Sequence, residues 1–115
     1  MARAAGLKPP EEMFSRFNVS RESSARLHIY VDLLLKWQKR INLIGPSTID
    51  EVWHRHIEDA LMLAEVVPAT ARNLIDLGSG AGIPGLVFAI AFGHERGFEM
   101  HLVESNGKKA AFLRE

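Results

Sequence analysis

The sequence predicts an α/β fold in which a helical N-terminal region is followed by the first strand–helix–strand (βαβ) unit of a parallel sheet. Before residue 70, apolar residues recur at helical spacing. After it come two short strand-like runs, 73-NLIDL-77 and 98-FEMHLVES-105, and a glycine-rich turn follows the first. A chain of 115 residues, 47% of them hydrophobic, can bury one modest core. We therefore expect a helical region over residues 1–70 and an α/β region over residues 71–115.

Composition excludes several classes of protein. Fourteen basic and 14 acidic residues give a formal net charge of zero, so no global field attracts nucleic acid or an anionic membrane. Without cysteine there is no disulfide framework and no thiolate zinc site. The N-terminus lacks the apolar stretch of a signal peptide, and no run suits a membrane span. We expect a cytoplasmic protein with no membrane partner, in which any nucleic-acid binding comes from a local patch.

The first two helices are expected before residue 45. Pro9 and Pro10 can open a short helix over residues 11–17, because the fixed φ of proline suits a first turn. Ser20 is a candidate N-cap for a long helix over about residues 21–42, which the glycine and proline of 42-NLIGP-46 would end. Its expected core-facing stripe is Leu27, Val31, Leu34, Trp37 or Gln38, and Ile41.

A third helix is expected over residues 50–67, before Pro68. Thr48 and Glu51 have the spacing of a capping box, in which each side chain bonds to the backbone N–H of the other. The helical pattern of the N-terminal region ends there.

The α/β region begins with a short apolar run at residues 73–77, which favours a strand buried in a parallel sheet. A helix is expected from Pro84 to about Gly93, then a strand over residues 98–105 and the start of another helix at 106-NGKKAAFLRE-115. A βαβ unit is right-handed by strong preference, so the two strands are expected to be parallel.

The loop 78-GSGAGIPG-85 lies where a βαβ unit binds ligands. Its backbone N–H groups and the dipole of the following helix can meet a polar group. From Gly80 onward it matches the dinucleotide pattern G-x-G-x-x-G. That match alone leaves three interpretations: a dinucleotide loop, a loop for another adenosine cofactor, and a tight turn without a ligand.

Two acids bear on the choice between these ligands. Asp76 precedes Gly78, Gly80 and Gly82 in a D-x-G-x-G-x-G arrangement that resembles motif I of class I methyltransferases. A carboxylate suits the sulfonium and amino groups of S-adenosylmethionine better than two phosphates. Glu104 ends the next strand, where a carboxylate can accept ribose hydroxyls from either S-adenosylmethionine or NAD. The residues favour S-adenosylmethionine and keep NAD as an alternative.

Most of the chain resembles the bacterial small-subunit rRNA guanine-N7 methyltransferases, the RsmG or GidB family. The segments that carry the resemblance are 36-KWQKRINLI-44, 55-RHIEDAL-61, 74-LIDLGSGAGIPGLVFAI-90 and 102-LVESNGKKAAFLRE-115. It implies a Rossmann-like class I methyltransferase fold that transfers a methyl group from S-adenosylmethionine to N7 of a guanine in 16S rRNA of the small ribosomal subunit. Members are much longer than 115 residues, so we expect an N-terminal fragment with an incomplete cofactor pocket.

The resemblance also implies roles for individual residues. Gly78 and Ile83 correspond to cofactor contacts, with Asp76, Gly80 and Gly82 in the same loop, and Glu104 corresponds to the ribose acid. Arg55 and His56 belong to the shared R-H-I-x-D pattern and are candidates for the cofactor or substrate pocket. For Arg55 the alternative is a helix-surface ion pair with Asp59, four residues later.

The expected chemistry needs no proton acceptor, because guanine N7 has a free lone pair at neutral pH. Catalysis would rest on alignment and exclusion of water, so no catalytic residue is assigned. A metal site is not expected, since His54 and His56 would point to different sides of a helix. Several basic and aromatic residues are candidates for RNA contact: Lys36, Lys39 and Arg40 around Trp37; His54, Arg55 and His56; and Lys108 and Lys109. For Lys36, Lys39 and Arg40 the alternative is a solvated helix face. For Trp37 the alternative is a position in the core.

Two other functions stay open at this point. The first is a non-catalytic, adenosine-binding remnant, because two strands alone have unpaired edges. The second is an NAD-dependent oxidoreductase, which the G-x-G-x-x-G match allows.

Overall fold

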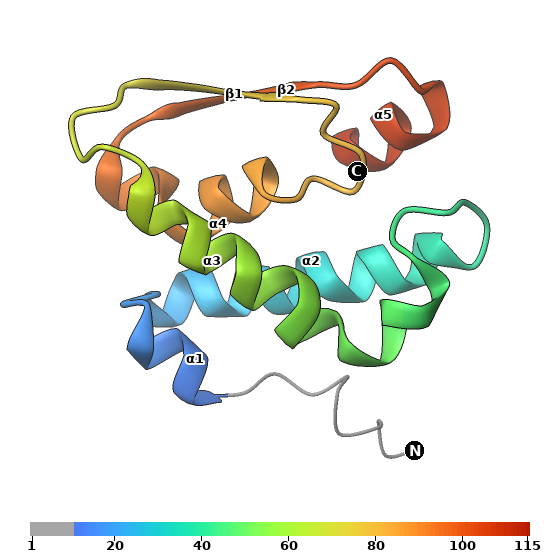
Figure 1. Ribbon diagram of the computed structural model, residues 1–115, viewed down its shortest axis with the longest axis horizontal. Helices are drawn as coiled ribbons and strands as arrows, with labels where there is room; N and C mark the ends of the chain where they lie inside the picture. The colour runs from blue at the N-terminus through green and yellow to red at the C-terminus, as the bar shows by residue number, and fades with distance from the viewer. Residues whose placement is uncertain (1–10) are drawn as a thin grey trace.

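A computed structural model describes residues 11–115 (Figure 1). Pro9 and Pro10, expected to open the first helix, lie outside these residues. The elements in order are α1 (Glu11–Arg16), α2 (Arg21–Gln38), the 3₁₀ helix η2 (Pro46–Glu51), the π-helix η3 (Trp53–Glu58), α3 (Asp59–Leu63), the 3₁₀ helix η4 (Ala64–Val66), β1 (Asn73–Leu77), α4 (Gly85–Arg96), β2 (Glu99–Val103) and α5 (Gly107–Arg114). A helical region thus precedes one strand–helix–strand unit, as predicted.

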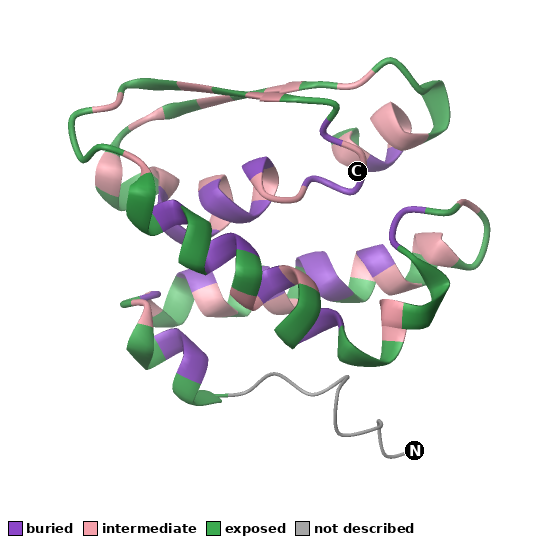
Figure 2. Cartoon of the chain, in the orientation of Figure 1, coloured by how far each residue is buried: buried purple, intermediate pink, exposed green. Residues whose placement is uncertain are grey.

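The elements are stacked from sheet to helices. β1 and β2 pair in parallel, with Asn73 opposite Glu99 and Leu77 opposite Val103, which confirms the predicted parallel pairing. α4 packs beneath the two strands and contacts α2 and α3 on its other side (Figure 1). Buried positions concentrate on the faces that these helices turn toward one another (Figure 2). One hydrophobic cluster runs from α1 through all the layers to Phe112 of α5.

Helix α2 begins where the sequence predicts and ends earlier. The Ser20 side chain caps it by accepting a hydrogen bond from Ser23 N at 3.1 Å. The stripe residues Leu27, Val31 and Leu34 are fully buried. Trp37 is only partly buried, so it borders the core and does not lie within it.

The end of α2 is set by Gln38, not by the glycine and proline at residues 45 and 46. Its Oε1 accepts hydrogen bonds from the N–H groups of Leu43 and Ile44 at 2.9 and 3.0 Å. Its Nε2 donates to Ile44 O at 2.9 Å and to Asn42 Oδ1 at 3.1 Å. The expected end at residue 42 was therefore wrong, because one amide folds the next six residues back against the end of the helix.

The third predicted helix is interrupted. In place of one α-helix over residues 50–67, the chain forms the 3₁₀, π, α and 3₁₀ segments η2, η3, α3 and η4 in succession. The predicted capping box is also wrong. The Thr48 hydroxyl donates to Gly45 O at 2.7 Å and contacts His56 Nε2 at 2.8 Å, so it holds the turn before η3.

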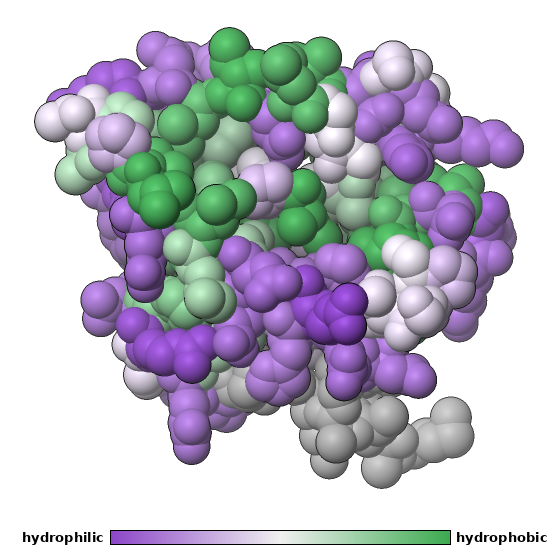
Figure 3. Space-filling view, viewed as in Figure 1, coloured by the Kyte–Doolittle hydropathy of each residue, from purple (hydrophilic) through white to green (hydrophobic). Residues whose placement is uncertain are grey.

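The sheet is covered on one face only. Along both strands exposed and half-buried residues alternate, and Ile75 and Leu77 are 65% and 77% exposed. The expectation of a buried strand is wrong for this outer face, because the described helices pack on the other face alone. Apolar side chains consequently gather at the top of the molecule in the view of Figure 3.

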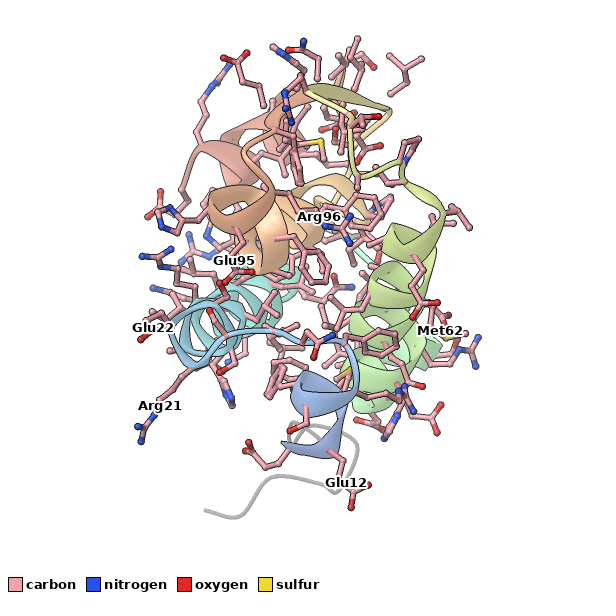
Figure 4. All side chains as sticks on the ribbon, turned by 90° about the vertical axis from the view of Figure 1, so that its left-hand side faces the viewer. Glu12, Arg21, Glu22, Met62, Glu95 and Arg96 are labelled. Atoms are coloured by element: carbon pink, nitrogen blue, oxygen red, sulfur yellow. The ribbon has the colours of Figure 1, made fainter. Side chains whose placement is uncertain are left out.

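The last two helices match the expected order with shifted ends. α4 continues three residues beyond the expected Gly93 and is closed by Gly97 in the left-handed conformation, with φ 69°. At its end Arg96 lies between α4 and α3 (Figure 4), where it donates to Ala64 O at 3.4 Å. α5 begins at Asn106, whose side chain caps the first turn. Among residues 11–115, no helix combines the length and apolar character that crossing a membrane requires.

Candidate cofactor site

The glycine loop between β1 and α4 is attached to the end of β2. The N–H groups of Gly78 and Ser79 both donate to the carbonyl of Val103, at 2.8 and 3.0 Å. The Ser79 hydroxyl is buried and donates to Asp76 O at 2.9 Å. The first turn of the loop is therefore fixed by both strands.

Glu104 closes the loop from the end of β2. Its Oε1 accepts a hydrogen bond from Gly80 N at 2.6 Å, and its Oε2 accepts one from Asn106 N at 2.9 Å. These two backbone bonds, the one from Asn106 first, lower the pKa of Glu104 below its ordinary value. A carboxylate has about four acceptor positions, so these bonds leave acceptor capacity for a hydroxyl group of a ligand. The structure thus joins two of the predicted cofactor residues, Gly80 and Glu104, directly.

Asp76 has a partner within the chain. Its Oδ2 accepts a hydrogen bond from Gly85 N at 3.0 Å, which caps the N-terminus of α4 with a negative charge. A Cβ at Gly85 would lie 2.6 Å from this oxygen and 2.7 Å from Leu102 Cδ2. Gly85 is therefore required by packing between α4 and the two strands, a role that the sequence patterns did not identify.

The predicted glycines divide into two kinds. At Gly82, with φ 88°, a Cβ would lie 2.8 Å from Leu86 Cβ, so packing as well as conformation requires glycine. At Gly78, with φ 71°, a Cβ would meet nothing within 4 Å. Gly80 also has a positive φ, and Ile83 is half-buried before a cis peptide bond to Pro84. The open space beside Gly78 leaves this side of the loop accessible to a ligand.

A tyrosine from the helical region holds the middle of the loop. The hydroxyl of Tyr30 in α2 donates to Ala81 O at 2.6 Å, and both residues are buried. Burial raises the pKa of Tyr30, so the hydroxyl keeps its proton and stays a donor. The sequence patterns did not single out Tyr30. Its position three residues after Leu27 on the apolar stripe was the available signal, because a buried tyrosine hydroxyl needs a partner.

Arg55 and His56 lie in η3, apart from the contacts that build the loop. The His56 ring contacts the Thr48 hydroxyl at 2.8 Å, and burial, followed by the nearby Arg55 charge, lowers the pKa of His56. Arg55 is exposed. Among ion pairs within the described residues, none joins Arg55 to Asp59. A π-helix has more residues per turn than an α-helix, which displaces residues four apart from each other.

Comparisons with known proteins agree on one family. The family model described as "GidB: rRNA small subunit methyltransferase G" matches residues 23–115. A "Ribosomal RNA small subunit methyltransferase G" of Paramagnetospirillum magneticum is 51% identical over 106 residues, which is 92% of this chain and 50% of the relative. A protein with the same name in Methylobacterium radiotolerans is 59% identical over 84% of this chain and 45% of the relative. Another, in a strain of Methylorubrum extorquens, is 54% identical over 90% of this chain and 48% of the relative. The chain spans about half the length of the curated relatives it matches.

Proposed function

Because the chain belongs to the GidB family of small-subunit rRNA methyltransferases, we propose that its glycine loop binds S-adenosylmethionine in a class I methyltransferase domain that methylates N7 of a guanine in 16S rRNA. The observation that carries this proposal is the bond from Gly80 N to Glu104, at 2.6 Å. It sets an ionised carboxylate at the edge of the loop, where ribose hydroxyls can donate to its free acceptor positions.

The hydrogen bonds of the loop favour S-adenosylmethionine over a dinucleotide. A pyrophosphate needs backbone N–H groups that point at the ligand. Here the N–H groups of Gly78, Ser79 and Gly82 donate to backbone carbonyls, and those of Gly80 and Gly85 donate to carboxylates. Two carboxylates beside the loop would also repel phosphates. The same acids suit a ligand that carries a sulfonium and an amino group.

The residues of this chain would bind and orient the cofactor and perform no proton transfer. S-Adenosylmethionine supplies an activated methyl group, and guanine N7 accepts it through its free lone pair. Glu104 would fix the ribose, and the open space beside Gly78 would admit the rest of the cofactor. The rate enhancement would come from alignment of the reacting atoms and exclusion of water.

The division of the chain into regions and the roles of single residues belong to the same proposal. Residues 71–115 would begin a Rossmann-like methyltransferase domain and residues 1–70 would form its helical N-terminal region, in a protein that acts on the small ribosomal subunit in the cytoplasm. Asp76, Gly78, Gly80, Gly82, Ile83 and Glu104 would surround the cofactor. Arg55, exposed and without an ion pair among the described residues, would face the RNA, with His56 positioned behind it by Thr48.

Calorimetric titration of the chain with S-adenosylhomocysteine and, separately, with NADH tests this function. We expect binding of S-adenosylhomocysteine with a dissociation constant in the micromolar range, about −8 kcal/mol, and none of NADH. Preferential binding of NADH would support the oxidoreductase alternative. Binding of neither ligand would contradict the proposed cofactor site in this chain.

A further inference from the structure

A polar groove separates the end of α2 from the start of α5. It has a volume of about 390 Å³ and is lined by Arg40, Ile41, Asn42, Asn106, Lys108 and Lys109. Three of these six residues are cationic and none is acidic. In Figure 1 the turn after α2 lies below α5, and in Figure 3 hydrophilic residues cover α5 on the same side of the molecule. The groove thus joins two basic segments that are far apart in the sequence.

The cations of the groove form no close ion pair with the described part of the protein. Among ion pairs within residues 11–115, none involves Arg40, Lys108 or Lys109. Both asparagines also present donors to the groove. Asn42 Oδ1 accepts from Gln38, and Asn106 Oδ1 accepts from the N–H groups of Lys108 and Lys109, so in each case the carbonyl oxygen is used within the protein. The amide nitrogens remain available to an acceptor.

Helix stability does not explain the two lysines. Lys108 and Lys109 stand in the first turn of α5, which contains no acidic residue. The positive end of the helix dipole disfavours cations there and favours acids. By contrast, cations near the C-terminus of α2, such as Lys36, are favoured by the dipole at that end. Lys108 and Lys109 therefore stand where the helix itself disfavours their charge. The Glu104 carboxylate offsets part of it at Lys109, and no acid among the described residues lines the groove beside Lys108, which leaves room for an external anion.

We propose that Arg40, Lys108 and Lys109 bind consecutive phosphates in the backbone of the substrate RNA. This inference rests on the proposed function and adds the surface that receives the RNA. Arginine and lysine side chains bind phosphates, and the amide nitrogens of Asn42 and Asn106 can donate to phosphate oxygens. A polyanion suits the groove because its charges repeat along its backbone, as the cations do from the turn after α2 to the start of α5.

The groove begins beside the candidate cofactor site. Asn106, in its wall, donates its backbone N–H to Glu104, and the Lys109 charge contributes to the lowered pKa of that acid. A strand whose backbone lay in the groove would therefore pass next to the ribose acid.

Fluorescence anisotropy with a labelled, unstructured RNA oligonucleotide at several salt concentrations tests the site. The variant Arg40→Gln/Lys108→Gln/Lys109→Gln removes three cations. Because each lost phosphate contact on single-stranded RNA reduces the slope of log K against log salt by about 0.7, we expect the slope to become shallower by about 2. The conservative variant Lys108→Arg/Lys109→Arg should keep the slope of the original protein.

The matched control is Arg21→Gln/Arg26→Gln/Arg72→Gln, which removes three cations outside the groove. Arg21, for example, points away from α2 into solvent (Figure 4). An equal loss of slope in the control, binding of polyglutamate as tight as that of RNA, or no RNA binding by the original protein would each overturn the proposal. Titration with S-adenosylhomocysteine separates the two claims, since failure of the cofactor site alone leaves the RNA results unchanged.

Discussion

The hydroxyl of Tyr30 in α2 donates a 2.6 Å hydrogen bond to the carbonyl of Ala81, in the middle of the glycine loop. Through this bond, a residue of the helical region fixes the conformation of a loop that lies 51 positions further along the chain. The loop is otherwise held by the strand ends at Val103 and Glu104. Its geometry therefore depends on both regions of the protein.

Replacing Tyr30 by phenylalanine should weaken both folding and cofactor binding. The change leaves the buried Ala81 carbonyl without its donor, which costs about 1–3 kcal/mol in the free energy of unfolding. We expect a loss of affinity for S-adenosylhomocysteine in calorimetry as well. The control is Ile57→Val, which removes a methyl group from the core of η3 at a cost of about 0.5–1.5 kcal/mol. An equal loss of affinity in both variants would show that general destabilisation is the cause.

Replacing Gly78 by alanine should impair cofactor binding more than it affects stability. The residue has φ 71°, and the space beside it is open. Gly97 provides a close match, with φ 69° and nothing within 4 Å of an added Cβ. Both substitutions should cost about 1–2 kcal/mol from backbone strain. Only Gly78→Ala should also weaken S-adenosylhomocysteine binding, and an equal effect of Gly97→Ala on affinity would contradict the site.

Replacing Gly85 by alanine should destabilise the fold. The new Cβ would collide with Asp76 Oδ2 and Leu102 Cδ2, at 2.6 and 2.7 Å, and such overpacking costs about 1–3 kcal/mol. Gly93→Ala, in the same helix with its nearest neighbour at 4.0 Å, should instead gain about 0.5–1 kcal/mol. Urea denaturation of both variants measures the difference. A neutral Gly85→Ala would show that α4 and the strands can move apart to accept a methyl group at low cost.

Stability should depend on the charge of Glu104. Its pKa is lowered in the folded protein, mainly by the backbone bond from Asn106 and then by that from Gly80, so the folded state favours the carboxylate. The stability that the ionised Glu104 contributes is fully present above its ordinary pKa of 4.5. It is lost as the pH falls through the lower pKa of Glu104 in the folded protein. The difference in melting temperature between the original protein and Glu104→Gln should therefore shrink below about pH 4.5.

Glu95→Gln is the control for that measurement, because it removes one acid from an exposed position of α4. Its difference in melting temperature from the original protein should change less with pH. A pH dependence equal to that of Glu104→Gln would mean that net charge, and not the closure of the loop, is responsible.

Replacing Arg55 by alanine should leave the fold intact and impair the reaction. The side chain is exposed and has no ion pair among the described residues, so the free energy of unfolding should stay within about 0.5 kcal/mol. In a methylation assay with small ribosomal subunits, we expect a large fall in rate for a full-length relative that carries the equivalent change. A fall in melting temperature that accounts for the lost activity would defeat this role.

Much of the fold could be predicted because local signals and tertiary packing agree. The serine at position 20, the glycine loop and the alternation of β2 each have a local signature, and the structure contains all three. The wrong predictions concern elements whose ends are set by side-chain contacts or by contacts between distant parts of the chain. Gln38 ends α2 through four hydrogen bonds to residues that follow it, and no propensity scale contains such an arrangement.

Some contacts among the predicted site residues follow from motif spacing, and others do not. Motif spacing indicated Asp76, Gly80 and Glu104, and the structure joins Glu104 to Gly80. Motif spacing could not indicate that Asp76 would cap α4, because that contact depends on how the helix approaches the strand. Tyr30 was missed for the same reason, because its partner lies on a different element and only the packing of α2 against α4 brings them together.

The hydrophobic cluster that runs from Met13 to Phe112 has a consequence for how the protein loses its structure. The helical region and the strand–helix–strand unit, which the sequence pattern separates at residue 70, contribute side chains to one interior. Neither could melt while the other kept its packing, because each would expose the apolar surface that it shares with the other. Loss of packing in either part should therefore loosen the interior that supports the glycine loop as well.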